Sequence, residues 1–280
     1  MCGIVGAVTE RRVRHILLEG LKRLEYRGYD SAGLATLEPN NEILRCRQIG
    51  KVANLVAEVG NLDLNGTIGI AHTRWATHGS VLVENTHPHM SDDYLALVHN
   101  GIIENNQLLK AQLQEKGYQF VSDTDSEVIV HLIDSQLKSG ISLVEAVRKS
   151  VKRLDGAYAI VVLSTEFPDR IVAARSGCPL VVGKGIGENF VASDVLALQA
   201  VTDRFIFLEE GDLVELTSDT IDIWNVENSS VIRADIKVEV GKDDLDKGRF
   251  RHFMEKEIFA QPEVLKESIG ARLGKHMVLE

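Results

Sequence analysis

The second residue of the chain is a cysteine, in the sequence Met1-Cys2-Gly3. An initiator methionine before a small residue is normally cleaved, and its removal would leave Cys2 with a free α-amine beside its own thiol. The reference pKa values are about 7.7–8.0 for such an amine and about 8.5 for the thiol, so proton transfer between them costs only about 1 kcal/mol. Cys2 is therefore a candidate nucleophile with its own amine as base. The alternative is that position 2 only tolerates a small residue.

An arginine and a tryptophan stand at the end of a short β-rich run, Thr67–Thr73. The strand would deliver Arg74 into a loop, where a guanidinium is suited to bidentate binding of a carboxylate. Trp75 beside it would shield a site from water, and Gly79 is a candidate hinge. A surface arginine and a core tryptophan are the alternative.

A second β-rich run, Tyr94–His99, leads into Asn100-Gly101. We expect the strand to end there, so that the Asn100 amide and the Gly101 N–H point at one spot, as an oxyanion hole requires. Asn-Gly is also the commonest hairpin dipeptide. The residues that follow have helical spacing, which disfavours the hairpin.

The segment Ser122–Glu127 is rich in hydroxyl and carboxylate side chains. It is typical of a helix N-terminus, where acidic charge is favourable. The alternative is that one of its carboxylates binds an ammonium group.

Five of the nine histidines fall within one stretch of the chain, which raises the alternative of a metal site. They are His72, His78, His87, His89 and His99. No Cys-x-x-Cys or His-Glu-x-x-His pattern accompanies them, and we place His87-Pro-His89 in a loop. We therefore expect no metal and no cofactor. Gly183–Gly187 follows a strand candidate but opens no helix, so we interpret it as a turn rather than a dinucleotide-binding loop.

The helices and strands that must position these residues are grouped along the chain and do not alternate as regular βαβ units. Helical spacing predicts helices at Val13–Leu24, Asn106–Lys116, Glu127–Lys138 and Leu143–Leu154. Strands are predicted at Gly3–Val8, Ser31–Leu37, Thr67–Thr73, Tyr94–His99, Tyr158–Leu163, Arg170–Ala174, Leu180–Gly183, Asn189–Ala192, Phe205–Leu208, Leu213–Leu216 and Thr220–Trp224. This order favours helices layered on antiparallel sheets, an α+β fold, over a doubly wound parallel sheet.

Composition narrows the function classes. The 280 residues include 41 acidic and 31 basic ones, so the formal net charge is −10. Because nucleic acids and membrane surfaces are negatively charged, we expect neither as a partner. The three cysteines, Cys2, Cys46 and Cys178, show no paired spacing and fit a reducing cytoplasm. Neither a signal peptide nor a membrane span is predicted. The charged segment Gly241–Gly248 resembles a linker, and helical spacing resumes from Phe250.

Taken in order, these segments resemble the class II (N-terminal nucleophile) glutamine amidotransferases, and in particular the members that pass the ammonia to fructose 6-phosphate. The resemblance covers nearly the whole chain. It rests on Met1–Gly6, Leu24–Gly33, Ala71–Gly79, His87–His89, Val98–Asn105, Thr124–Glu127 and Phe205–Asp212, with Met254–Ile258 and Gln261-Pro262 resembling an interdomain region.

The resemblance implies a role for each matching residue. Cys2 would be the nucleophile, and Asn100 with the Gly101 N–H would form the oxyanion hole. Arg74 would hold the α-carboxylate of glutamine, and Asp125 its α-ammonium group.

It also implies how these residues are enclosed. Thr77 and His78 would lie in a loop that closes over the substrate, Trp75 would gate ammonia release, and Arg27 and Gly28 would support the terminus.

The resemblance further implies a four-layer αββα sandwich of the N-terminal nucleophile hydrolase type. Residues 1–240 would form a glutaminase domain. Residues 241–280 would form a linker and the start of a sugar-phosphate isomerase domain, the rest of which is missing from this sequence. That domain would be the partner, and a homodimer would form through it. Glutamine is the expected substrate, hydrolysed to glutamate and ammonia. A non-catalytic regulatory module with the same fold remains the alternative.

Overall fold

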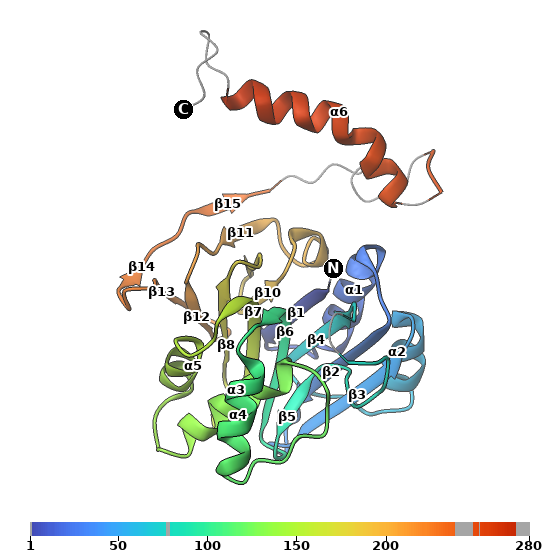
Figure 1. Ribbon diagram of the computed structural model, residues 1–280. Coiled ribbons are helices and arrows are strands. Elements are labelled where there is room, and N and C mark those ends of the chain that lie inside the picture. The colour runs from blue at the N-terminus through green and yellow to red at the C-terminus, as the bar shows by residue number, and fades with distance from the viewer. Residues whose placement is uncertain (1, 77–78, 239–248, 252, 273–280) are drawn as a thin grey trace. The chain divides into compact units, whose positions relative to one another are not determined.

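The computed structural model describes residues 2–76, 79–238, 249–251 and 253–272. The chain divides into two compact units, Met1–Val238 and Glu239–Glu280. The first unit contains two antiparallel sheets and five α-helices, and it carries all the site residues predicted above (Figure 1).

The first sheet has eight strands in the order β15-β11-β9-β10-β1-β4-β2-β3, and the second has seven in the order β14-β13-β12-β8-β7-β6-β5. The strands of the first sheet are β1 (Gly3–Thr9), β2 (Ser31–Leu37), β3 (Ile43–Ile49), β4 (Ile68–Arg74), β9 (Val181–Lys184), β10 (Glu188–Ala192), β11 (Arg204–Phe207) and β15 (Asp235–Lys237). Those of the second are β5 (His89–Ser91), β6 (Leu95–Ile103), β7 (Gly156–Ser164), β8 (Ile171–Ser176), β12 (Leu213–Leu216), β13 (Ile221–Trp224) and β14 (Ser230–Val231).

Helices cover the outer face of each sheet. They are α1 (Arg14–Leu24), α2 (Val52–Val59), α3 (Asn106–Glu115), α4 (Ser126–Leu137) and α5 (Leu143–Val151), with short 3-10 turns at Glu25–Arg27 and Val195–Ala197. The apolar face of α1 and α2 packs on the first sheet, and that of α3, α4 and α5 packs on the second (Figure 1).

A third hydrophobic cluster lies between the two sheets. Its members come from inward-facing positions of both, for example Ile4 and Ile70 of the first sheet and Val98 and Val161 of the second. Three apolar interfaces therefore separate four layers. The predicted αββα sandwich is confirmed, and the doubly wound parallel sheet is excluded for this unit.

The predicted elements are present, with boundaries shifted by a few residues. Two predictions about the site are wrong. Strand β6 does not end at His99, because its pairing with β7 continues through Ile103 opposite Gly156. Asn100-Gly101 therefore lies inside a strand, and it is no hairpin turn. His89 is likewise not in a loop, since it opens the short strand β5.

Five of the helices and strands given above have no counterpart among the predicted elements: β3, β5, β14, β15 and α2. In β3, the residues Arg45, Arg47 and Gln48 interrupt the apolar pattern of the strand. Helix α2 has only eight residues and no side-chain N-cap bond. Ser142, by contrast, caps α5 as its spacing to Glu145 predicts, because its Oγ accepts the Glu145 N–H at 3.3 Å.

The second unit contains one described helix, α6 (Phe253–Arg272), which includes Pro262 and matches the helical spacing predicted from Phe250. The predicted linker Gly241–Gly248 lies outside the described residues. Across the described part of the chain, no helix is both long and apolar enough to cross a membrane.

Candidate active site

Strand alternation brings the predicted site residues to one end of the space between the sheets. Side chains alternate between the two faces of a strand. Ile4 of β1, Ile70 of β4 and Val98 of β6 all belong to the cluster between the sheets. Two residues away from each, Cys2, His72 and Asn100 continue that inward-facing series. Arg74 follows His72 by the same step, at the end of β4.

The Cys2 thiol lies against the backbone of Trp75. The Trp75 N–H donates to Sγ at 3.2 Å, and Sγ is 3.6 Å from the Trp75 carbonyl oxygen. Burial raises the pKa of the Cys2 thiol, and the hydrogen bond from the Trp75 N–H acts in the opposite sense by stabilising the thiolate. A base close to the thiol is therefore needed for it to act as a nucleophile near neutral pH.

The Asn100 side chain bridges Cys2 and a histidine. Its Nδ2 donates to the Cys2 carbonyl oxygen at 3.3 Å, and its Oδ1 lies 3.0 Å from Nε2 of His72. The next residue, Gly101, has φ +138°, and a Cβ at this position would lie 1.9 Å from the carbonyl oxygen of Ala157. Only glycine fits there, so the direction of the backbone is fixed at this point of β6.

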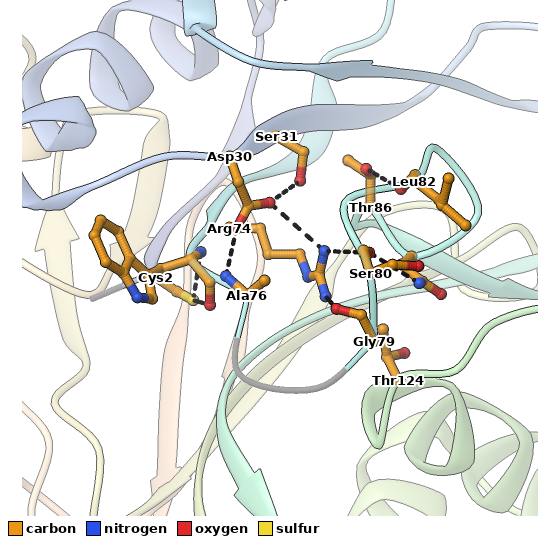
Figure 2. Close-up of polar contacts among 12 residues, drawn as sticks. Cys2, Asp30, Ser31, Arg74, Ala76, Gly79, Ser80, Leu82, Thr86 and Thr124 are labelled. Atoms are coloured by element: carbon orange, nitrogen blue, oxygen red, sulfur yellow. Dashed lines mark hydrogen bonds and ion pairs between the residues drawn. The ribbon is translucent and has the colours of Figure 1, made fainter.

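Arg74 is a buried cation, with 4% of its surface exposed, so it is not the surface arginine of the alternative interpretation. Its guanidinium donates to the carbonyl oxygens of Ser80, at 3.2 Å, and Gly79, at 3.1 Å. Figure 2 shows that it also faces the carboxylate of Asp30, at 3.5 Å. The guanidinium thus ties the end of β4 to the loop at residues 79–80.

Asp30 holds the other side of the same loop. Its carboxylate accepts hydrogen bonds from the Ala76 N–H and, at 2.9 Å, from the Ser31 hydroxyl (Figure 2). The aspartate therefore neutralises Arg74 and fixes the chain just after Trp75. No role for Asp30 is predicted from the sequence, although this residue falls within the Leu24–Gly33 segment that carries the resemblance.

Trp75 is 53% exposed, so it is not a core residue. Its indole rests on the backbone of Gly28, where a Cβ would lie 2.0 Å from Cε3 of the ring. The neighbouring Arg27 forms an ion pair with Asp194. These contacts place the Leu24–Gly33 segment beside Trp75, whose backbone contacts the Cys2 thiol.

Asp125 is the N-cap residue of α4, but its side chain makes no capping bond. Instead its Oδ2 accepts the Ile103 N–H at 2.7 Å, which joins the start of α4 to the end of β6. The predicted helix N-terminus is confirmed, although the Asp125 carboxylate bonds to β6 and not to the first turn of α4. The carboxylate of Glu127 satisfies the preceding loop, accepting the N–H groups of Val121, at 3.0 Å, and Ser122, at 2.7 Å. Thr77 and His78 lie outside the described residues.

Four of the histidines that raised the alternative of a metal site are buried: His72, His87, His89 and His99. Among the described residues, no group of three or more His, Cys, Asp or Glu side chains is arranged to hold a metal ion. His89 and His99 each have a ring nitrogen bonded to a hydroxyl, that of Thr124 at 3.1 Å and that of Ser126 at 2.8 Å. Burial lowers the pKa of His72 and of His89 to about 3, so both are neutral near pH 7.

Comparison with known proteins identifies the domain. Residues 72–200 match the model of a glutamine amidotransferase domain. The whole chain is 56% identical over 279 residues to a glutamine–fructose-6-phosphate aminotransferase of Pseudomonas putida. The chain contains a glutamine amidotransferase domain. It is 54% identical to the corresponding protein of Idiomarina loihiensis and 51% identical, over 99% of its length, to that of Salmonella paratyphi A. It spans 46% of the length of each of these relatives.

Solved structures agree with this assignment. One is a glutamine phosphoribosylpyrophosphate amidotransferase of B. subtilis, with TM-score 0.70 and 25% identity. The match covers 80% of the present chain and 49% of the B. subtilis chain. A glutamine aminotransferase class-II domain protein of Silicibacter pomeroyi matches with TM-score 0.55 and 14% identity, which supports the fold alone.

Proposed function

We propose that this amidotransferase domain hydrolyses the side-chain amide of glutamine, with Cys2 as the nucleophile once Met1 has been removed. The observation that carries the proposal is the meeting of three groups from distant parts of the chain: the Cys2 thiol, the Trp75 N–H at 3.2 Å from it, and the Asn100 amide at 3.3 Å from the Cys2 carbonyl oxygen. A nucleophile and a polarising donor then meet at one point, as acyl transfer requires.

In the proposed reaction, the neutral α-amine of Cys2 takes the thiol proton, and the thiolate attacks the Cδ carbon of glutamine. The Asn100 side chain and the Gly101 N–H hold the negative oxygen of the tetrahedral intermediate. The amine then returns the proton to the nitrogen, the C–N bond breaks and ammonia leaves. Water attacks the γ-glutamyl thioester, which yields glutamate and regenerates the thiol.

The groups that would bind the rest of glutamine carry the right charges. Arg74 would bind the α-carboxylate, and its burial next to Asp30 favours a fixed guanidinium over a mobile surface one. Asp125 would bind the α-ammonium group with its carboxylate, whose Oδ2 accepts the Ile103 N–H at 2.7 Å and whose Oδ1 accepts the Ser126 hydroxyl at 3.5 Å. Thr77 and His78 would close over the substrate, and Trp75 would control the exit of ammonia.

A glutaminase assay with Cys2→Ala as the comparison tests this proposal. The unaltered chain should release glutamate and ammonia, Cys2→Ala should release neither, and a chain that retains residues before Cys2 should be inactive because the α-amine is then blocked. Activity of the blocked chain would exclude the amine as base. A folded, unaltered chain with a free Cys2 amine and no turnover would favour the regulatory module.

The full protein is proposed to pass the ammonia to fructose 6-phosphate, as the names of the relatives indicate for those proteins. Residues 1–240 would then be the glutaminase domain, and residues 241–280 a linker and the start of an isomerase domain, through which a homodimer would form. The three free cysteines support a cytoplasmic location. This division into a glutaminase domain and an isomerase domain can be tested with glutamine and fructose 6-phosphate as substrates. The full-length protein should form glucosamine 6-phosphate, and the 280-residue chain should not.

A further inference from the structure

His72 is a buried polar residue to which the proposed reaction assigns no part. It lies on β4, opposite Ile4 of β1, with 1% of its surface exposed. Its Nε2 is 3.0 Å from Oδ1 of Asn100, 28 residues further along the chain. On the other side of the same amide, Nδ2 is 3.3 Å from the Cys2 carbonyl oxygen. His72 therefore contacts the side chain proposed to stabilise the oxyanion, on the side away from the nucleophile.

An asparagine amide needs a partner that distinguishes its two ends. The oxygen and nitrogen ends have nearly the same shape but opposite hydrogen-bonding character. With Nδ2 directed at Cys2, the amide offers hydrogens to the Cys2 carbonyl oxygen and to a developing oxyanion. Rotated by half a turn, it would direct Oδ1 at both, and the same side chain would repel the charge that it is meant to stabilise.

The protonation of His72 decides which end faces Cys2. Burial lowers its pKa to about 3, so near pH 7 the imidazole is neutral and carries one N–H. A proton on Nε2 bonds to Oδ1 and holds Nδ2 toward Cys2. A proton on Nδ1 would leave a lone pair on Nε2 facing Oδ1 and would favour the rotated amide. The His87 ring packs on the His72 ring, with centroids 4.1 Å apart, and restricts its rotation.

We propose that His72 is a positioning residue, whose Nε2–H holds the Asn100 amide in the orientation that stabilises the oxyanion; this inference rests on the proposed role of Asn100. His72 touches neither glutamine nor the thiol in this scheme. Its contribution should therefore appear in turnover and vanish when the Asn100 amide is absent.

The decisive experiment measures glutamine hydrolysis by the 280-residue chain with a free Cys2 amine, and compares His72→Met, Asn100→Ala and the double variant. Loss of one oxyanion donor lowers kcat roughly 100- to 1,000-fold. His72→Met should lower kcat by roughly 10- to 100-fold with KM changed less than about threefold, because the donor remains but is no longer oriented. In the Asn100→Ala background, His72→Met should cause no further loss.

His72→Gln supplies the conservative comparison. Its terminal amide can place an N–H near the position of Nε2, so it should recover most of the turnover, whereas the shorter His72→Asn should not. If His72→Met fails to fold, the difference in turnover between His72→Gln and His72→Asn tests the role of the N–H group at position 72. His15→Met is the control, because His15 is exposed on α1, at the outer face of the first sheet. It removes a histidine that contacts none of these groups and should leave kcat unchanged.

The tautomer provides a readout that is independent of activity. The imidazole ¹⁵N spectrum should show His72 protonated at Nε2 and neutral near pH 7. An Nδ1–H tautomer, a His72→Met variant with full turnover, or equal losses from His72→Met with and without Asn100 would each overturn the inference. Full turnover by Asn100→Ala would instead remove the oxyanion assignment of the proposed function, so the two failures are distinguishable.

Discussion

At the scale of single residues, the site depends on positions where the backbone leaves no choice of side chain. Gly101 cannot carry a Cβ because the Ala157 carbonyl oxygen occupies its place, and Gly28 cannot because the Trp75 ring does. Both glycines also have positive φ, +138° and +120°. Glycine adopts such conformations without steric cost, whereas a residue with a side chain would be strained in them, and here they border the Cys2 thiol and its contacts.

The Gly28–Trp75 contact leads to a prediction about the indole. A methyl group at position 28 would lie 2.0 Å from Cε3 of Trp75, so Gly28→Ala should displace the ring. We expect a change in Trp75 fluorescence and acrylamide quenching, and a lower ratio of kcat to KM for glutamine. Trp224 is the other tryptophan, so the measurement is best made in a Trp224→Phe background.

Gly117→Ala is the matched control for this prediction. Gly117 has φ +91°, but a Cβ added there would meet no atom within 4 Å, so the variant tests backbone strain without the clash. If both alanine variants alter the Trp75 signal equally, the contact between Gly28 and the indole is not the cause.

At the scale of elements, the sequence predicts the strands that carry the site better than it predicts their mutual placement. The apolar runs at Gly3–Val8 and Thr67–Thr73 correspond closely to β1 and β4, because buried strands leave a strong local signal. The pairing of His72 with Asn100 has no such signal. It depends on how β4 and β6 of two different sheets stack, and residue types and spacing do not encode that stacking. The same holds for Asp125, whose predicted place at a helix N-terminus gave no sign of its bond to Ile103.

Helix α4 is held at its start by an acidic side chain that the sequence suggested only as favourable charge. Both oxygens of Glu127 accept hydrogen bonds: Oε1 from the Val121 N–H, and Oε2 from the N–H and the hydroxyl of Ser122. Burial alone would raise the pKa of Glu127, but these bonds and His131 lower it to about 2. The loop before Asp125 is thus fixed by a carboxylate that stays ionised.

We predict that Glu127→Gln loosens this loop. The amide introduced at position 127 must direct its N–H groups at backbone N–H or hydroxyl donors on one side. This loss of hydrogen bonds should lower the free energy of unfolding by roughly 1–3 kcal/mol. Because Asp125 follows the loop directly, KM for glutamine should rise more than kcat falls. Urea denaturation and steady-state kinetics measure the two effects. Glu115→Gln, at an exposed position of α3, should change stability by less than about 0.5 kcal/mol. An unchanged KM in Glu127→Gln would separate the loop from substrate binding.

At the scale of the whole first unit, four neutral histidines are buried near the site. Burial lowers the pKa of His72 and His89 to about 3, that of His87 well below its usual value, and that of His99. In the unfolded chain each would titrate near pH 6.5. Below that pH the unfolded state binds more protons than the folded state, so stability that is fully present above pH 6.5 is lost as the pH falls toward the folded pKa values.

This linkage predicts a steep loss of stability in a pH range where few carboxylates titrate. His72 and His89, whose folded pKa values are about 3, would each contribute about 1.4 kcal/mol per pH unit below pH 6.5. The lowered pKa of Glu127 acts in the same direction, but only below its unfolded value of about 4.5, so the window from pH 6.5 to 4.5 reports the histidines. Urea midpoints measured across that window should fall steeply, and His89→Gln should reduce the slope by about one proton. Replacing His15, which is exposed on α1, should leave the slope unchanged. A slope that His89→Gln does not alter would mean that this imidazole is protonated in the folded state as well as in the unfolded chain, contrary to the lowered pKa of His89.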